Sequence, residues 1–99
     1  MQINIHAPFK VNDGLKALIT EKLEKLNTFY GRILKADVHL RLKVSTVLNG
    51  KTVEISLHLP GKDAFAKDTE DTFEKAVAAV AAKLEKQLKK RKDILAQKH

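Results

Sequence analysis

The ten residues from Lys83 to Lys92 contain six basic side chains and a single acid. Their net charge of +5 supplies most of the formal +7 of the 99-residue chain. Leu84 and Leu88 are one helical turn apart, which predicts a helix that buries an apolar stripe and exposes a basic one. A row of uncompensated ammonium groups on a rigid helix is typical of a surface that binds a polyanion, so this segment predicts contact with nucleic acid, above all RNA.

Further cations extend this interpretation. Lys22 falls within the apolar arc of an earlier helix and is expected to snorkel to the edge of the helix layer. On the last helix, one flank of the apolar stripe, beside a groove between the helices, is expected to carry Lys75, Lys83, Lys86 and Lys90. The predicted RNA contacts are Lys22, Lys25, Arg32, Lys75, Lys83, Lys86, Lys89, Lys90, Arg91 and Lys92. Because few amide or aromatic groups accompany them, contact is expected mainly to phosphate and sugar. The alternative is an ordinary solvated lysine face.

Three histidines invite a metal hypothesis. By strand alternation, His6, His39 and His58 all project from one sheet face. Arg41 and Lys43 lie among them, and no carboxylate or thiolate ligand has a useful spacing. We therefore expect an ordinary polar sheet surface, with no metal and no cofactor.

Motifs for catalysis are missing from the sequence. It contains no glycine-rich phosphate loop, serine elbow, catalytic cysteine or His-x-x-x-His pattern. Asp37 and His39 share a strand face but have no nucleophile beside them. Phe29 and Tyr30 could stack on bases, although aromatic residues at a helix end more often close a core. The expectation is a protein that is not an enzyme and has no small-molecule substrate.

Alternating apolar residues predict the strands that must position these groups. The first strand spans 1–6, and the inward sets of the next two are Ala36, Val38, Leu40, Leu42 and Val44, and Val53, Ile55, Leu57 and Leu59. Asn49-Gly50 predicts the tight turn of a hairpin, which would place His58 near Arg41. Pro60-Gly61 predicts another turn, followed by a short edge strand at 64–67.

Two helices are predicted from apolar residues at helical spacing. Asn12 is expected to cap a helix that runs to about Thr28, with Gly31 as its stop and a buried stripe of Leu15, Leu18, Ile19, Leu23, Leu26 and Tyr30. The segment 68–71 is expected to place acid in the first turn of the last helix, which favours the helix dipole. That helix is expected to end at about Asp93, with Phe73, Val77, Val80, Ala81, Leu84 and Leu88 inward.

The order β-α-β-β-β-α predicts an α+β fold. Both helices should lie side by side on one face of a four-stranded mixed sheet, with the opposite face open to water. A right-handed first crossover makes the first two strands parallel and the others antiparallel. We expect one domain at 1–93 and a short frayed tail at 94–99. The sequence lacks cysteine, a signal peptide and an apolar run of the roughly 18 residues that a membrane span needs, so a cytoplasmic location without a membrane partner is expected.

Six segments, in this order, resemble one known family. They are 1–5 (MQINI), 20–26 (TEKLEKL), 37–39 (DVH), 57–61 (LHLPG), 71–73 (DTF) and 83–90 (KLEKQLKK). The chain thus resembles the short ribosome hibernation-promoting factor family, also called ribosome-associated inhibitor or sigma-factor modulation proteins. The fold also resembles the core of double-stranded RNA-binding domains, as an analogy of fold alone.

The resemblance implies binding to the small ribosomal subunit. Family members occupy the channel of mRNA and the A- and P-site tRNAs, with basic helices against 16S rRNA, and keep ribosomes idle during stress and stationary phase. The matching basic positions are Lys22, Lys25, Lys83, Lys86, Lys89 and Lys90. The chain departs from the family at Ala7–Lys10. It is expected to be a short form, without the second domain of long-form members. Whether it pairs ribosomes, with or without a second hibernation factor, stays open.

The expected function is therefore translation inhibition by steric exclusion at the decoding region. Two rival hypotheses remain. One is a general binder of structured RNA that is not confined to ribosomes. The other is a protein-interaction module that acts through the open sheet face.

Overall fold

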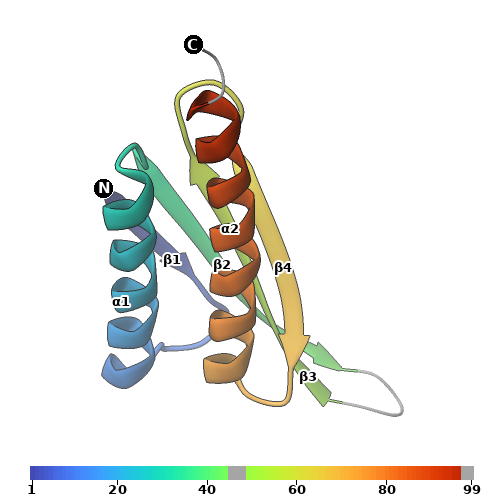
Figure 1. The fold of residues 1–99 in the computed structure, drawn as a ribbon. Coiled ribbons are helices and arrows are strands. Elements are labelled where there is room, and N and C mark those ends of the chain that lie inside the picture. Colours follow the sequence, from blue (N-terminus) through green and yellow to red (C-terminus); the bar gives the residue numbers. More distant parts are fainter. Residues whose placement is uncertain (45–48, 97–99) are drawn as a thin grey trace.

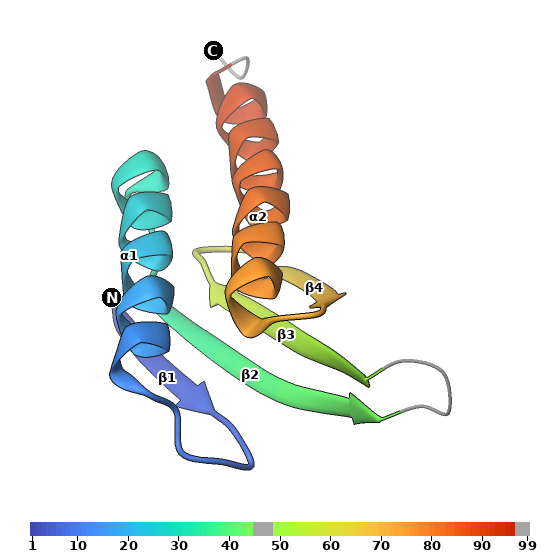
Figure 2. The same ribbon diagram turned by 90° about the horizontal axis from the view of Figure 1, so that it is seen from below.

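The protein forms two layers, a four-stranded sheet and a pair of helices that both cover the same face of it (Figure 1). The structure is a computed structural model that describes residues 1–44 and 49–96. Its elements are β1 (Gln2–His6), α1 (Asp13–Tyr30), β2 (Lys35–Val44), β3 (Asn49–His58), β4 (Ala64–Glu70) and α2 (Phe73–Ala96). The predicted α+β fold and element order are confirmed. Figure 2, turned by 90°, shows the helices as a separate layer above the sheet.

The sheet has the spatial order β1-β2-β3-β4. β1 and β2 are parallel, whereas the other neighbours are antiparallel, as predicted. Register places Ile5 opposite Val38, Val38 opposite Ile55 and Ile55 opposite Ala66. This row crosses all four strands on the face that the helices cover, so the alternating apolar residues meet as one continuous floor of the core.

The core lies between this floor and the apolar stripes of the helices. Its largest fully buried side chains include Ile19, Leu23, Leu40, Ile55, Leu57, Leu84 and Leu88. The predicted inward faces are therefore confirmed over most of the chain. Leu42 is the exception, because 54% of it is exposed. Leu42 lies near the end of β2. The end of this strand and the start of β3 extend past the helices (Figure 1). The predicted inward side chain of Val44 lies outside the described residues.

The predicted Asn49-Gly50 turn is wrong. Both residues begin β3, where Asn49 pairs with Val44 and Gly50 pairs with Lys43. The connecting residues 45–48 lie outside the described part of the chain. A glycine is needed at position 50 because the side chain of Thr69 lies very close to its backbone: a Cβ there would be 2.5 Å from Cγ2 of Thr69. β3 therefore begins at Asn49, where the predicted two-residue turn would have placed the loop.

This change of register separates two residues that were expected to be neighbours. His58 pairs with Lys35, and Arg41 pairs with Thr52. The prediction that His58 lies near Arg41 is therefore wrong, because the whole of β3 is displaced along β2 relative to a turn at Asn49-Gly50.

The ends of α1 follow the local sequence. Oδ1 of Asn12 accepts a hydrogen bond from the backbone N–H of Leu15 at 2.8 Å, which confirms the predicted cap. Gly31 adopts a left-handed φ of 79°, and its N–H donates to the carbonyl of Asn27. The helix ends at Tyr30, slightly beyond the predicted end at Thr28.

The start of α2 was predicted wrongly. Residues 68–70 belong to β4, whose pairing with β3 runs as far as Glu70 opposite Lys51. The helix begins only at Phe73, and the hydroxyl of Thr72 caps it by accepting from the N–H of Lys75 at 3.1 Å. It continues to Ala96, past the predicted end at Asp93, while 97–99 lie outside the described residues.

Across the described ranges 1–44 and 49–96, the structure has no helix with an apolar stretch long enough to cross a membrane.

Candidate nucleic-acid interface

A groove of about 330 Å³ runs between the two helices. Its α1 side includes Lys22 and Lys25, and its α2 side consists of the small residues Ala78, Ala81 and Ala82 together with Glu85. Lys22 is partly buried at this edge of the helix layer, where the sequence had placed it. The carboxylate of Glu85 shares the groove, so the groove itself is not purely cationic.

Lys92 bridges the two helices at the end of α1. Its Nζ donates to the backbone carbonyl of Phe29 at 2.7 Å and lies 4.6 Å from the centre of the Phe29 ring. A cation at this position satisfies a terminal carbonyl and is favoured by the helix dipole. Lys92, one of the predicted RNA contacts, therefore already has a structural role in the free protein.

Three side chains of α2 bind the outer edge of β4. They are spaced four residues apart and donate to backbone carbonyls at alternate positions of the edge segment. Lys83 donates to Lys67 O at 3.1 Å, Gln87 to Phe65 O at 2.8 Å, and Arg91 to Asp63 O at 2.8 Å. A second nitrogen of Arg91 donates to the carbonyl of Lys62. Such cover leaves fewer free carbonyls on an edge strand that could otherwise pair with another chain.

This arrangement changes the predicted grouping of the cations. Lys83 was expected on the same flank as Lys75, Lys86 and Lys90, but its Nζ lies 3.3 Å from Oδ2 of Asp68, beside β4. Lys75 pairs with Asp71 at 3.2 Å, within the connection to β4 and the first turn of α2. Neither amine is left without a counter-charge.

The outer face of the C-terminal half of α2 differs. Lys86, Lys89 and Lys90 are exposed, and in the described part of the chain none of them forms an ion pair. The same holds for Lys22 within those residues, whereas Lys25 pairs with Glu21 at 3.3 Å. We call Lys86, Lys89 and Lys90 the outer cationic face. These three predicted RNA contacts lie within little more than one turn of a single helix, and none has an acidic partner among the described residues.

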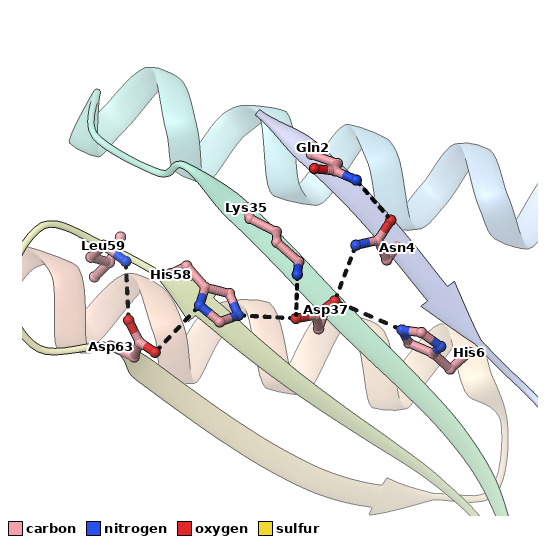
Figure 3. A network of polar contacts seen from close by, with 8 residues as sticks. All are labelled: Gln2, Asn4, His6, Lys35, Asp37, His58, Leu59 and Asp63. Atoms are coloured by element: carbon pink, nitrogen blue, oxygen red, sulfur yellow. Dashed lines mark hydrogen bonds and ion pairs between the residues drawn. The ribbon is translucent and has the colours of Figure 1, made fainter.

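The open face of the sheet carries charge of both signs. Asp37 on β2 has a side chain only 19% exposed, and Nε2 of His58 lies 2.9 Å from its Oδ2 (Figure 3). An ionised carboxylate can only accept, so the ring nitrogen donates. Nδ2 of Asn4 donates to Oδ1 of Asp37 at 3.2 Å, and Nζ of Lys35 lies 3.7 Å from Oδ2. The hydrogen bond from His58, with help from those of Asn4 and the charge of Lys35, holds the pKa of Asp37 below its usual value.

Two further contacts extend this network, which we call the Asp37 network. Nδ1 of His58 lies 3.4 Å from Oδ2 of Asp63, and Nε2 of His6 lies 3.7 Å from Oδ1 of Asp37 (Figure 3). The ring of His6 stacks on that of His39 with centroids 4.6 Å apart. Within the described residues, no group of three or more potential ligands is arranged to hold a metal ion.

Sequence reasoning missed the Asp37 network because it used the wrong hairpin register. Strand alternation does place Asp37 and His58 on one face, and that was the available signal. The true register brings His58 opposite Lys35, two residues from Asp37, so the carboxylate and imidazole meet. A second pair of contacts neutralises Glu54 on the same face, with Arg41 at 3.4 Å and Lys67 at 3.7 Å.

Comparison with known proteins identifies relatives across almost the whole chain. The sequence profile described as "Sigma 54 modulation protein / S30EA ribosomal protein" matches residues 2–96. A protein of Pseudomonas putida named "Ribosome hibernation promoting factor" is 31% identical over 94 residues, which cover 94% of this chain and 88% of that protein.

Two solved structures share the fold. A ribosomal subunit interface protein from Coxiella burnetii superposes with a TM-score of 0.81 at 24% identity, covering 94% of this chain and 99% of that one. The N-terminal domain of Protein Y from Thermus thermophilus gives a TM-score of 0.78 at 23% identity, covering 91% and 98% respectively. With its sequence profile matched from residue 2 to 96, the chain belongs to the Sigma 54 modulation protein / S30EA ribosomal protein family.

Proposed function

We propose that this protein is a ribosome hibernation factor that binds 16S rRNA in the decoding region of the small subunit and blocks translation by excluding mRNA and tRNA. Membership of the family and the name of the Pseudomonas putida relative support a role on the ribosome. Steric exclusion needs affinity and shape complementarity and no chemistry, which agrees with the lack of catalytic motifs in the sequence.

The observation that carries the proposal is the outer cationic face. Lys86, Lys89 and Lys90 are exposed on a long, continuous helix and pair with no carboxylate among the described residues. Each amine can therefore meet a phosphate without first breaking an internal ion pair. Lys22, at the helix groove, and Arg32, exposed just after α1, extend the cationic surface toward the neighbouring helix.

Most of the remaining predicted contacts already have partners within the protein. Lys83, Arg91 and Lys92 hold backbone carbonyls, and Lys25 and Lys75 pair with acids. Any contact that they make to RNA must compete with these internal partners. We therefore assign the principal phosphate contacts to Lys22, Lys86, Lys89 and Lys90.

Co-sedimentation tests the function. The protein should pellet with isolated small subunits, be displaced by bound mRNA and tRNA, and lose affinity steeply as salt rises, because phosphate contacts release counterions. A general RNA binder would instead follow any RNA duplex added as competitor. Binding that ignores salt would contradict the phosphate model.

Lys22→Glu is the sharpest single substitution for the groove side of this surface. We expect roughly tenfold weaker binding to small subunits at low salt, since a phosphate contact is replaced by repulsion. The fold should survive because the side chain is only partly buried.

Lys16→Glu is the matched control, with the same change of charge on the exposed outer side of α1, beside Glu21 and Glu24. It should bind almost as well as the unaltered protein. Equal loss in both variants would mean that total charge, and not this surface, governs binding. Unfolding of Lys22→Glu, seen by circular dichroism, would show that its side chain has a structural role.

A further inference from the structure

A second pocket, of about 280 Å³, lies at the end of the molecule where both helices finish. Three segments meet there: the last residue of α1 with the following turn, the β3–β4 connection, and the last turns of α2 (Figure 1). Its apolar surface comes from Tyr30, Pro60, Ile94 and Leu95. The last two are large apolar side chains that are 46% and 50% exposed.

Cations rim this apolar surface. Arg32, Lys62 and Arg91 all line the pocket, and within the described residues its lining includes no acid. This separates it from the inter-helix groove, which includes Glu85. Arg32 and Lys62 are exposed and form no ion pair in the described part of the chain, so the rim is complementary to an anion.

Arg91 is held rigidly in the wall. Its two terminal nitrogens donate to the carbonyls of Lys62 and Asp63, which fixes the guanidinium plane. The flat faces of a guanidinium and of a tyrosine ring both stack on nucleobases. An apolar slot with flat, immobilised groups and a cationic rim has the chemistry to hold a base by its faces and the adjoining phosphates by their charge.

We infer that this pocket binds one unpaired nucleotide of the RNA partner, with the base against Tyr30, Ile94 and Leu95 and its phosphates at Arg32 and Lys62. This inference rests on the proposed function for the identity of the partner as RNA. It goes beyond the contact mainly to phosphate and sugar that the sequence predicts, and of the two roles considered for Tyr30, base stacking and closing the core, it adds the first. The pocket would anchor the end of the basic helix at a position where the RNA has an unstacked base.

The sequence supplies a specific reporter for the test. Tyr30 is the only tyrosine and the chain has no tryptophan, so its fluorescence lifetime reports on this pocket alone. The probes are a short oligoadenylate and an abasic ribose-phosphate oligomer with the same number of phosphates. We expect the oligoadenylate to bind about fivefold or more tightly at the same salt concentration, and to shorten the lifetime of Tyr30, because a stacked base contributes at least that much affinity.

Two variants and one control locate the effect. Leu95→Gln should remove most of the preference for oligoadenylate. Tyr30→Leu, measured with labelled oligomers, should do the same while keeping an apolar side chain against the core. Leu42→Gln removes a leucine that is similarly exposed, at 54%, at the far end of β2, and should keep the preference.

The outcomes separate this inference from the proposed function. Equal affinity for both oligomers with an unchanged Tyr30 lifetime would overturn the inference, while salt-sensitive pelleting with small subunits would still uphold the proposed function. Selective oligoadenylate binding without pelleting would uphold the pocket and overturn the ribosomal assignment. A lifetime change with an acidic apolar peptide, but none with oligoadenylate, would overturn the inference in favour of a protein ligand.

Discussion

The outer cationic face of α2 and the open face of the sheet both carry several charged side chains, yet they differ in what those charges meet. On the sheet, the Asp37 network joins a carboxylate to His58 and Lys35, and Glu54 lies near two further cations. On α2, three neighbouring lysines have no acidic partner among the described residues. A high count of charged residues therefore does not identify a binding surface. We propose that the absence of internal compensation is the better guide, and it distinguishes the outer cationic face from the sheet face.

The same contrast occurs within α2 itself. Lys83 and Lys86 are three residues apart in one basic run and look equivalent in the sequence. Lys83 turns toward β4 and meets Asp68, whereas Lys86 turns to solvent without an acidic partner in the described chain. Packing, and not residue type, decides which lysine stabilises the fold and which is free for a ligand.

We expect the largest effect on binding to small subunits when the outer cationic face is neutralised, and almost none when the sheet face is. Lys86→Gln, Lys89→Gln and Lys90→Gln together should weaken binding to small subunits by on the order of 100-fold at low salt and lower the log–log salt slope by roughly 2 to 3. Lys35→Gln, Arg41→Gln and Lys67→Gln remove the same number of charges from the sheet face. Affinity of this control should change by less than about twofold at the same salt, since the three cations already have acidic partners. Equal losses in both triple variants, measured by titration with fluorescent protein, would erase the distinction between the faces.

A smaller effect should separate the two kinds of lysine on α2. Lys86→Gln alone should reduce the salt slope by about 0.9, whereas Lys83→Gln should leave the slope nearly unchanged. Lys83→Gln should instead lower the free energy of unfolding by about 0.5 kcal/mol, because it removes an exposed ion pair and one hydrogen bond to β4. A fall in slope for Lys83→Gln would show that RNA displaces Asp68 from this amine.

Lys92→Gln should have an effect of similar size on stability and none on binding. Loss of the cation at the end of α1 should cost about 0.5 kcal/mol in urea unfolding. Binding to small subunits should keep its salt slope. A lower slope would place Lys92 with the outer cationic face instead of with the structural cations.

The Asp37 network gives the smallest change near neutral pH and a distinct signature in acid. The folded-state pKa of Asp37 is lowered, so its contribution to stability is fully present above the ordinary carboxyl pKa of about 3.9 and is lost as the pH falls through the lower folded value. Asp37→Asn should therefore be less stable than the unaltered protein at pH 5, and this difference should shrink below about pH 4. Urea midpoints of both proteins across this range provide the measurement. A difference that grows in acid would contradict the assigned direction of the pKa.

Local sequence determined more of the fold than of the site. The strand faces, the buried stripes of both helices, the Asn12 cap and the Gly31 stop were all predicted, because each depends on residues within one or two turns or on simple alternation. The parallel β1–β2 pair followed from the handedness of the crossover. The basic character of α2 was equally visible.

Tertiary structure decided the register and the partner of each cation. Asn49-Gly50 and residues 68–70 lie in strands that pair along β2, β3 and β4, against a turn signal and a helix-start signal. Extending an antiparallel ladder adds further backbone hydrogen bonds, which favours the longer strands. That register created the Asp37 network. The sequence could not distinguish the side of α2 that faces β4 from the side that faces solvent. Helical spacing shows which residues share a side of the helix, but only the packed neighbours determine which side is buried against β4. A basic run in a sequence thus predicts that a charged helix exists, and the surrounding layers determine which of its amines remain available.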